Sequence, residues 1–168
     1  MSADSAGRGS DAGRGPDAGR GSHAGRGLSP PNFEDLKVGQ EIPVYSKVVK
    51  REDVKAYADA SGDQNPLHQD DNFARSVGFP GIIAHGMFTM AHLASALTRW
   101  AGDPAALKRI KVQFRAVVYM DETIEAGGTI AALDPGTRTA TVDVWVRLTR
   151  AGEEEQPIKN AQAEVRFA

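Results

Sequence analysis

The sequence predicts an α+β fold in which a curled antiparallel sheet wraps around one long buried helix. The helix is expected at 86–101, where apolar residues cover more than one face and the charged residue, Arg99, comes near the end. Four later segments have the composition of strands: 107–118, 123–133, 140–149 and 157–167. A helix that is apolar most of the way round has to be surrounded by other structure, and these strands supply it.

One strand and two short helices are predicted before the long helix. Residues 41–49 are rich in Val, Ile and Tyr, as strands are. Residues 52–60 begin with two acidic side chains, which suit the positive end of a helix, and Gly62 is placed to end it. A second helix is expected at 70–77, again with an acidic start and with Gly78 after it.

Apolar and polar residues alternate clearly in two of the later strands, as expected when one face of a sheet is buried. The apolar positions are Val142, Val144, Val146, Leu148, Ala161, Ala163, Val165 and Phe167. Turn residues separate the strands at 134–136 and at 151–152. Exposed edge strands are a liability unless they are paired or covered. We therefore expect a homodimer or a heterodimer with a continuous sheet.

A repeat near the N-terminus divides the chain. Between residues 6 and 27 the sequence Ala-Gly-Arg-Gly recurs with a period of six, without any aromatic or β-branched residue. Such a stretch cannot bury enough apolar area to offset the entropy of ordering its backbone. Arg-Gly spacing also occurs in RNA-binding segments, but these usually carry more cations and often stacking aromatics. We predict a disordered Gly/Arg repeat tail at 1–30 and a single domain at 31–168.

Composition excludes several classes of function. The chain has no cysteine, so disulfides, thiolate-held metals and cysteine nucleophiles are ruled out. The net charge of -2 gives no global attraction to nucleic acid or to a membrane surface. No apolar run approaches the roughly 18 residues that span a bilayer, and the N-terminus lacks the apolar core of a secretory signal. We expect a cytoplasmic protein with neither a nucleic-acid nor a membrane partner.

The loop between the two short helices, SGDQNPLH at 61–68, holds a carboxylate, an amide and an imidazole: Asp63, Asn65 and His68. Pro66 disfavours a helical conformation at Asn65, so a compact loop is needed to bring Asp63 and His68 together. An imidazole titrates near neutral pH and a carboxylate can orient it, as general acid–base catalysis requires. In the alternative, structural interpretation, Asp63 caps a turn and His68 is an ordinary polar residue.

A second motif, IIAHGM at 82–87, starts the long helix. Glycine lets another group approach the backbone closely, and the first amides of a helix have no acceptor within the helix. The N–H of Gly86 is therefore a candidate to stabilise a developing oxyanion. The alternative is that Gly86 serves packing alone.

Both motifs resemble those of a known family. The run at 61–68, with Tyr57 before it and Ala74 after it, closely resembles the signature of MaoC-like (R)-specific enoyl-thioester hydratases and dehydratases. The segment AHGM at 84–87 is similar to that family's helix-start segment. With further similarity at 33–39 and 112–118, the resemblance covers essentially residues 31–168.

Within the family, the chain is particularly similar to the β subunits of actinobacterial type II fatty-acid-synthase (3R)-hydroxyacyl-carrier-protein dehydratases. The segments that carry this similarity are IAHGM at 83–87, Thr89-Met90 and Gly102-Asp103-Pro104. The resemblance implies a hot-dog fold and an acyl-CoA or acyl-carrier-protein substrate.

The resemblance also implies a role for each site residue. Asp63 and His68 would hold and activate one water, which adds to C3 of a trans-2-enoyl thioester while a proton reaches C2; dehydration is the reverse. The amide of Gly86 would bind the thioester carbonyl. Asn65 would orient the loop, with its amide within reach of substrate. No metal and no organic cofactor is implied.

Other interpretations of the polar residues are open. A metal site could be drawn from His68, Asp70, Asp71 and His85, although no two of the histidines have the helical i, i+4 spacing. His85, beside the candidate oxyanion glycine, is either a substrate contact or a buried histidine bonded to backbone. We expect His92, Trp100 and the methionines to fill the core. Four cationic side chains could bind the phosphates of a substrate, and the alternative is that each is an ordinary surface charge. They are Arg75, Lys108, Arg109 and Lys111.

The sequence departs from the family pattern in two places. Val118-Tyr119 stands where relatives often have proline, and Ala94 stands where some hydratases have a serine on the buried helix; Ser95 should face elsewhere.

A fold alone does not fix the chemistry, so two further classes of function stay open for this fold. These are an acyl-thioesterase and a subunit of a heterodimeric dehydratase that has a non-catalytic partner.

Overall fold

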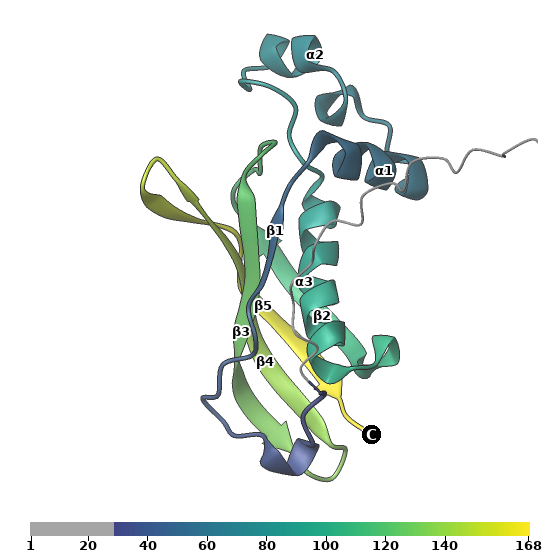
Figure 1. Ribbon diagram of the computed structural model, residues 1–168, viewed down its shortest axis with the longest axis vertical. Helices are drawn as coiled ribbons and strands as arrows, with labels where there is room; N and C mark the ends of the chain where they lie inside the picture. The colour runs from purple at the N-terminus through teal and green to yellow at the C-terminus, as the bar shows by residue number, and fades with distance from the viewer. Residues whose placement is uncertain (1–28) are drawn as a thin grey trace, which may run out of the picture.

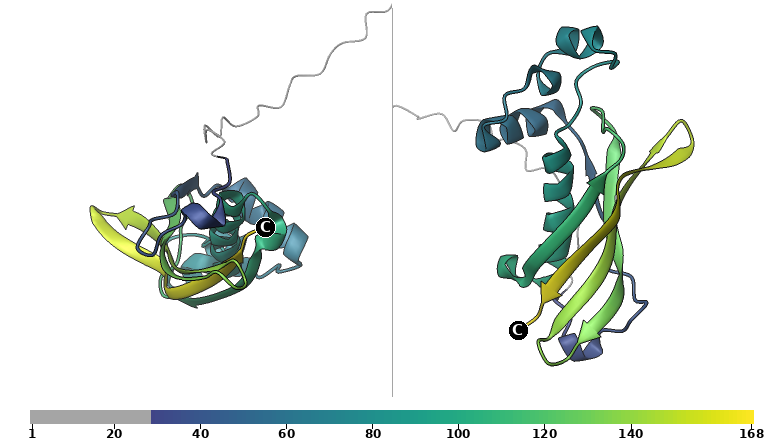
Figure 2. Two further views of the ribbon diagram at one scale, coloured as in Figure 1. Left: turned by 90° about the horizontal axis from the view of Figure 1, so that it is seen from below. Right: turned by 180° about the vertical axis from the view of Figure 1, so that it is seen from behind.

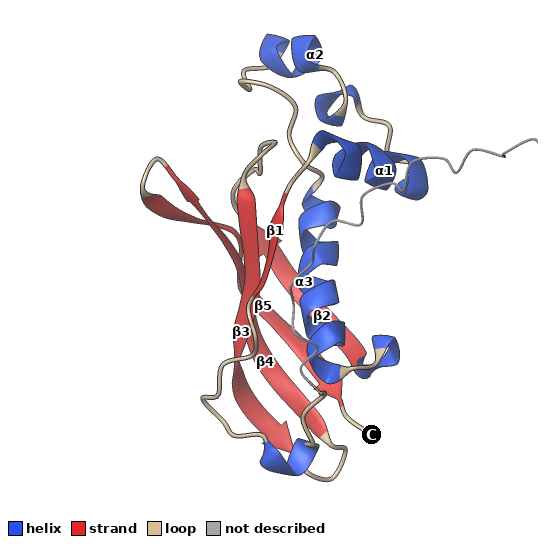
Figure 3. Ribbon diagram, viewed as in Figure 1, coloured by secondary structure: helices blue, strands red, loops and turns tan. Residues whose placement is uncertain are grey.

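The computed structural model describes residues 29–168, in which a five-stranded antiparallel sheet curls around helix α3 (Figures 1 and 3). The strand order across the sheet is β1-β3-β4-β5-β2. The strands are β1 Tyr45–Val48, β2 Leu107–Phe114, β3 Thr123–Asp134, β4 Thr139–Arg150 and β5 Glu153–Arg166. The predicted α+β class, with one long helix held by a curled sheet, is confirmed.

The helices fall into two groups. They are α1 Arg51–Ser61, α2 Asp71–Ser76 and α3 Gly86–Ala101, with short 3₁₀ helices η1 Phe33–Asp35, η2 Pro66–His68 and η3 Pro104–Ala106. α3 lies along the sheet, and its observed bounds are those predicted from its apolar pattern. α1, η2 and α2 lie together beyond one end of the sheet, near the first turn of α3 (Figures 1 and 2). This end of the molecule carries both motifs singled out in the sequence.

The core forms between α3 and the sheet. Leu93 and Leu97 of α3 are fully buried, and the alternating apolar residues of β4 and β5 are buried as predicted. The expectation that Trp100 and the methionines fill the core is right for Trp100 and wrong for Met87, whose exposed fraction is 50%. Met87 lies in the first turn of α3, on a face that the sheet leaves uncovered.

Two elements before α3 are shorter than predicted. The strand expected at 41–49 is reduced to β1, because Pro43 has no N–H for a ladder and Glu41 forms only an isolated bridge. The helix expected at 70–77 begins one residue later, because Asp70 is its N-cap and accepts hydrogen bonds from two backbone N–H groups.

Two strands after α3 also differ in length from the prediction. The strand expected at 107–118 ends at Phe114, because the chain then leaves the sheet to form a loop. The strand expected at 157–167 begins earlier, at Glu153, because the tight turn at 151–152 lets β4 and β5 pair up to the hairpin tip. The polar sequence at the start of β5 concealed this pairing.

The predicted Gly/Arg repeat lies outside the described residues. The domain boundary near residue 31 and the expected dimer stay predictions; in the described chain, β1 and β2 are the edge strands of the sheet. None of the helices in residues 29–168 combines the length and the apolar character needed to span a membrane.

Candidate active site

Helix α1 delivers the candidate catalytic loop to the end of the sheet. α1 ends at Ser61, and Gly62 follows with a φ of 77°, a left-handed conformation that favours glycine. The N–H of Gly62 donates to the carbonyl of Ala58 at 2.9 Å. The chain therefore turns sharply off the helix and places Asp63 at the start of the loop.

Two side-chain-to-backbone hydrogen bonds fold the loop. The carboxylate of Asp63 accepts from the N–H of Asn65 at 3.3 Å, and the side-chain carbonyl of Asn65 accepts from the N–H of Leu67 at 3.0 Å. Asn65 is thus the N-cap of η2, a helical turn that the sequence did not predict and that ends at His68. A carboxylate oxygen of Asp63 and a ring nitrogen of His68 come within 4.8 Å of each other. The loop brings together the acid and the imidazole as predicted.

The ring of His68 is oriented by a backbone group from the second motif. Its Nδ1 lies 2.8 Å from the carbonyl oxygen of Ile83. Since a carbonyl only accepts, Nδ1 carries the proton in this hydrogen bond, and the neutral ring has its lone pair on Nε2. Sequence reasoning missed Ile83, because its contribution is a main-chain oxygen that leaves no side-chain signal. The contact leaves Nε2 of His68 as the atom able to accept a proton.

His85 packs behind this pair. It is the N-cap residue of α3, 2% exposed, and its ring stacks on that of His68 at a centroid distance of 3.8 Å. Its Nε2 donates to the backbone carbonyl of Asp63 at 3.2 Å, while its buried Nδ1 has no hydrogen-bond partner. Burial lowers the pKa of His85, and the neighbouring His68 acts in the same direction. His85 therefore joins the backbone of Asp63 to the face of the His68 ring.

Gly86 opens α3 beside the same loop. As the first helical residue, its N–H has no acceptor within the helix. A methyl group at this position would lie 3.4 Å from the ring of Phe114, so the two residues are neighbours. Farther along the helix, the hydroxyl of Ser95 donates to the carbonyl of Ala91 at 2.8 Å. The hydroxyl of Ser95 is thus bonded within its own helix.

Asp63, His68 and His85 form the one group in residues 29–168 whose ligand atoms are close enough to hold a metal ion, all within 4.8 Å of one another. The two imidazoles are stacked with an angle of 29° between their planes. Ring lone pairs lie in the ring plane, so nearly parallel rings do not aim them at one common point. Asp70 and Asp71, drawn into a metal site from the sequence, are occupied elsewhere: Asp70 caps α2, and Asp71 accepts from Arg51 and from the amide of Ile82. The ligand types would suit a metal, but the orientation of the two stacked rings does not.

The cations considered from the sequence do not belong to this group. Arg75 donates to Asn72 within α2, and Lys108, Arg109 and Lys111 are exposed on the edge strand β2.

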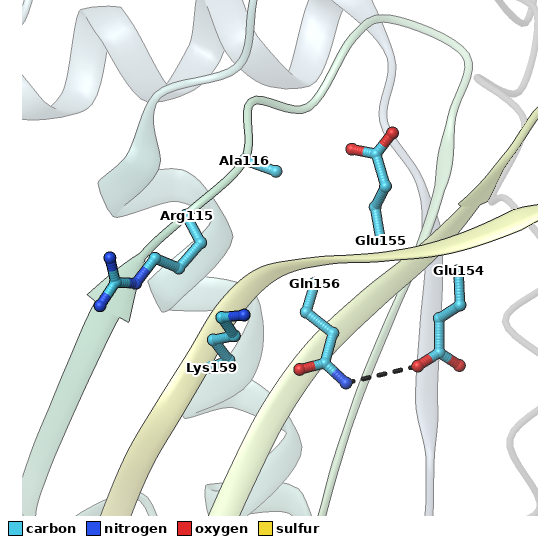
Figure 4. Close-up of a pocket in the computed structure, with 6 residues that line it drawn as sticks. All are labelled: Arg115, Ala116, Glu154, Glu155, Gln156 and Lys159. Atoms are coloured by element: carbon cyan, nitrogen blue, oxygen red, sulfur yellow. Dashed lines mark hydrogen bonds between the residues drawn. The ribbon is translucent and has the colours of Figure 1, made fainter.

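A separate hollow of about 450 Å³ lies between the end of β2 and β5 (Figure 4). Its lining residues are Arg115, Ala116, Glu154, Glu155, Gln156 and Lys159. None of them was among the predicted site residues.

The site as a whole combines a carboxylate, a free imidazole nitrogen and an unpaired helix N-terminus at one end of a hot-dog sheet. A carboxylate, an imidazole and a helix N-terminus are the kinds of group that acid–base chemistry beside a polarised carbonyl uses. The chain belongs to the MaoC-like domain family, whose family model matches residues 34–151.

Relatives within the family are hydratases and dehydratases. The chain is 35% identical over 109 residues to a 3-hydroxybutyryl-CoA dehydratase of Methylorubrum extorquens, covering 64% of this chain and 69% of the relative. It is 32% identical over 110 residues to an (R)-specific enoyl-CoA hydratase of Rhodospirillum rubrum, covering 65% and 76%. A solved (R)-hydratase from A. caviae, involved in PHA biosynthesis, superimposes with a TM-score of 0.70 at 26% identity, over 80% of this chain and 99% of that one.

Proposed function

We propose that this chain catalyses the reversible hydration of trans-2-enoyl thioesters to (3R)-hydroxyacyl thioesters. The observation that carries the proposal is the loop that holds the Asp63 carboxylate next to a His68 ring whose Nε2 is free. The relatives named (R)-specific enoyl-CoA hydratase and 3-hydroxybutyryl-CoA dehydratase support the same reaction class.

In the proposed mechanism, Asp63 and His68 hold one water between them. In the direction of hydration, the water oxygen bonds to C3, one water proton passes to Nε2 of His68, and the imidazolium then gives that proton to C2. The sum is one water added across the double bond, and dehydration runs through the same steps in reverse. The Ile83 carbonyl stabilises the imidazolium that forms, because its hydrogen bond to Nδ1 strengthens when the ring is charged.

Charge that builds on the thioester carbonyl is met by the start of α3. As C2 becomes enolate-like, the carbonyl oxygen gains negative charge, and the N–H of Gly86 donates to it at the positive end of the helix. Asn65 orients the catalytic loop through its cap on η2, and His85 supports the loop from behind. These residues supply the proposed chemistry without a metal or an organic cofactor.

We assign an acyl-CoA or acyl-carrier-protein thioester as the substrate and a dimer as the working form. Two edge strands and a half-exposed Met87 and Phe114 at the site end support a second subunit, identical or different. Native mass spectrometry of the chain expressed alone is expected to show a stable dimer; a monomer that becomes active only with another chain would identify a heterodimer subunit. The β-subunit resemblance and the cytoplasmic location stay predictions.

The test is the loss of enoyl absorbance when the protein is incubated with crotonyl-CoA. We expect Asp63→Asn and His68→Ala each to lower kcat by about 100- to 10,000-fold, since each removes an acid–base group. Asp143→Asn, an exposed acid on β4 whose side chain accepts from Gln162, is the matched control and should keep kcat within about twofold. Unchanged turnover in both loop variants would contradict the mechanism, and release of free thiol without hydration would identify a thioesterase.

A further inference from the structure

A charged cluster outside the site converges on Arg150, the last residue of β4. Its guanidinium binds both oxygens of Glu122, with Nε–Oε1 at 2.7 Å and Nη2–Oε2 at 2.9 Å, and its Nη1 lies 2.6 Å from Oε2 of Glu155. Nη2 also donates to the carbonyl of Val117 at 3.0 Å, and the guanidinium lies 4.8 Å from the centre of the Tyr119 ring. All of the polar partners are half-buried or better. Figure 4 shows Glu155 directed from β5 toward the loop that follows Ala116.

These contacts fix the loop 117–122 between β2 and β3 at both ends. Arg150 binds the carbonyl of Val117 near its start and the side chain of Glu122 at its end. Glu122 accepts in addition from the N–H of Tyr119 at 2.8 Å. A bidentate arginine–carboxylate pair is directional as well as strong. The loop is therefore held in one conformation by Arg150 and Glu122 together.

The same loop holds the backbone of the second site motif. The carbonyl of Val118 accepts from the N–H of Ala84 at 2.8 Å, and Tyr119 forms an antiparallel bridge with Ile83. The carbonyl of Ile83 is the group that binds Nδ1 of His68. Only His85 separates Ala84 from Gly86. A shift of the loop thus moves both the imidazole and the start of α3.

A second connection runs to the catalytic loop through α1. Val49 exchanges two backbone hydrogen bonds with the loop, accepting from the N–H of Asp121 at 2.8 Å and donating to the carbonyl of Glu122 at 2.9 Å. α1 begins two residues later, and the loop that follows its far end contains Asp63. The loop 117–122 therefore positions the segments on both sides of the site.

We propose that Arg150 is a positioning residue for the hydratase reaction, which acts by clamping the loop 117–122 against Ile83 and Ala84. The inference rests on the proposed function. The side chain does not reach the substrate; it sets the direction of the Ile83 carbonyl and hence the orientation of the His68 ring. Misplacing a catalytic group by about 1 Å can cost up to about 100-fold in rate.

Arg147 provides a matched control on the same strand. It also pairs with two carboxylates, Glu125 at 3.0 Å and Glu154 at 3.6 Å, and it lies 4.3 Å from the centre of the Trp145 ring. None of these partners belongs to the loop 117–122. Loss of Arg147 removes a similar charge, two similar ion pairs and a similar ring contact without releasing the loop.

The activity test compares Arg150→Gln, Glu122→Gln and Arg147→Gln with crotonyl-CoA. We expect kcat to fall about tenfold or more in the first two variants with KM changed less than about threefold, and to stay within about twofold in Arg147→Gln. The double variant Arg150→Gln/Glu122→Gln should have a kcat no lower than that of the slower single variant, because the two substitutions remove the same clamp. Glu155→Gln, which leaves every contact between Arg150 and the loop in place, should lose less than Glu122→Gln.

A second readout is independent of turnover. In protein labelled with ¹⁵N-histidine, the Nδ1–H resonance of His68, assigned by its absence in His68→Gln, should be sharp in the wild-type chain and in Arg147→Gln. It should broaden or shift in Arg150→Gln and Glu122→Gln. If the wild-type chain does not hydrate enoyl thioesters, the proposed function fails while this resonance still tests the clamp. If Arg150→Gln does not fold, Glu122→Gln decides, since it keeps the contacts of Arg150 with Val117 and Glu155. A folded Glu122→Gln with wild-type kcat and an unchanged resonance would overturn the proposal.

Discussion

His85 at the start of α3 and His92 in its middle are built alike but belong to different regions. Both are buried, both donate from Nε2 to a backbone carbonyl, and both stack on another ring. The ring beneath His85 is the catalytic candidate His68, whereas the ring beneath His92 is Tyr45, which is itself covered by the guanidinium of Arg99. A buried imidazole is therefore no sign of function by itself. Its neighbour decides whether it supports a site or a core.

The sheet and the start of α3 should differ most in how well they tolerate an added methyl group. A methyl group at Gly128, in the sheet, would lie 2.6 Å from the backbone oxygen of Asp143, which cannot move alone, whereas one at Gly86 would lie 3.4 Å from the half-exposed ring of Phe114. We expect Gly128→Ala to lower the free energy of unfolding by about 3 kcal/mol and Gly86→Ala by less than about 1 kcal/mol. Urea unfolding of the two variants measures the difference, and equal losses would show that the site end is packed as tightly as the sheet.

Removing each buried imidazole should separate activity from structure. Glutamine at either position keeps an N–H donor but loses the stacked ring. His85→Gln is expected to lower kcat by about 10- to 100-fold, because the support behind His68 and Asp63 is lost. His92→Gln should keep kcat within about threefold. Steady-state kinetics with crotonyl-CoA decides, and similar kcat values in the two variants would remove the distinction drawn between the two histidines.

A further expected difference is a pH dependence of stability that belongs to the core region. Burial lowers the pKa of His92 from 6.5 to about 4. Between these values the unfolded chain binds a proton that the folded chain does not, so stability falls as the pH is lowered through this window. From pH 7.5 to pH 5 the loss attributable to His92 is about 2 kcal/mol.

Urea unfolding at several pH values checks this assignment. His92→Gln should remove most of that slope, and the part that is left should belong largely to His85, whose pKa is also lowered by burial. A pH dependence that is identical in His92→Gln and in the wild-type chain would show that the slope arises from other groups.

Local patterns predicted a large part of the fold and of the site. The bounds of α3 could be predicted because its apolar residues are continuous and Gly102 ends it with a φ of 71°. The meeting of Asp63 and His68 could be predicted because both lie in one short loop with Pro66 between them. In each case the determining residues are neighbours in the sequence.

Contacts between distant backbone segments could not be predicted. The carbonyl of Ile83 orients His68 from 15 residues away, and the loop held by Arg150 acts through main-chain hydrogen bonds. Any residue supplies such a carbonyl, so no pattern of side chains marks it. The exposed Met87 was wrongly assigned to the core for a related reason, because an apolar pattern does not say which face the rest of the chain will cover.

The strand order has a consequence for how the chain assembles. β2 is made soon after α3, yet its only partner within the described sheet is β5, the last strand along the chain. In a chain emerging from the ribosome, β1, β3 and β4 can pair while β2 still has both edges free. Unpaired strands of this kind are prone to pair with the wrong molecule. The arrival of β5 between β4 and β2 therefore completes the sheet, and until that moment β2 is a strand without a partner in the described sheet.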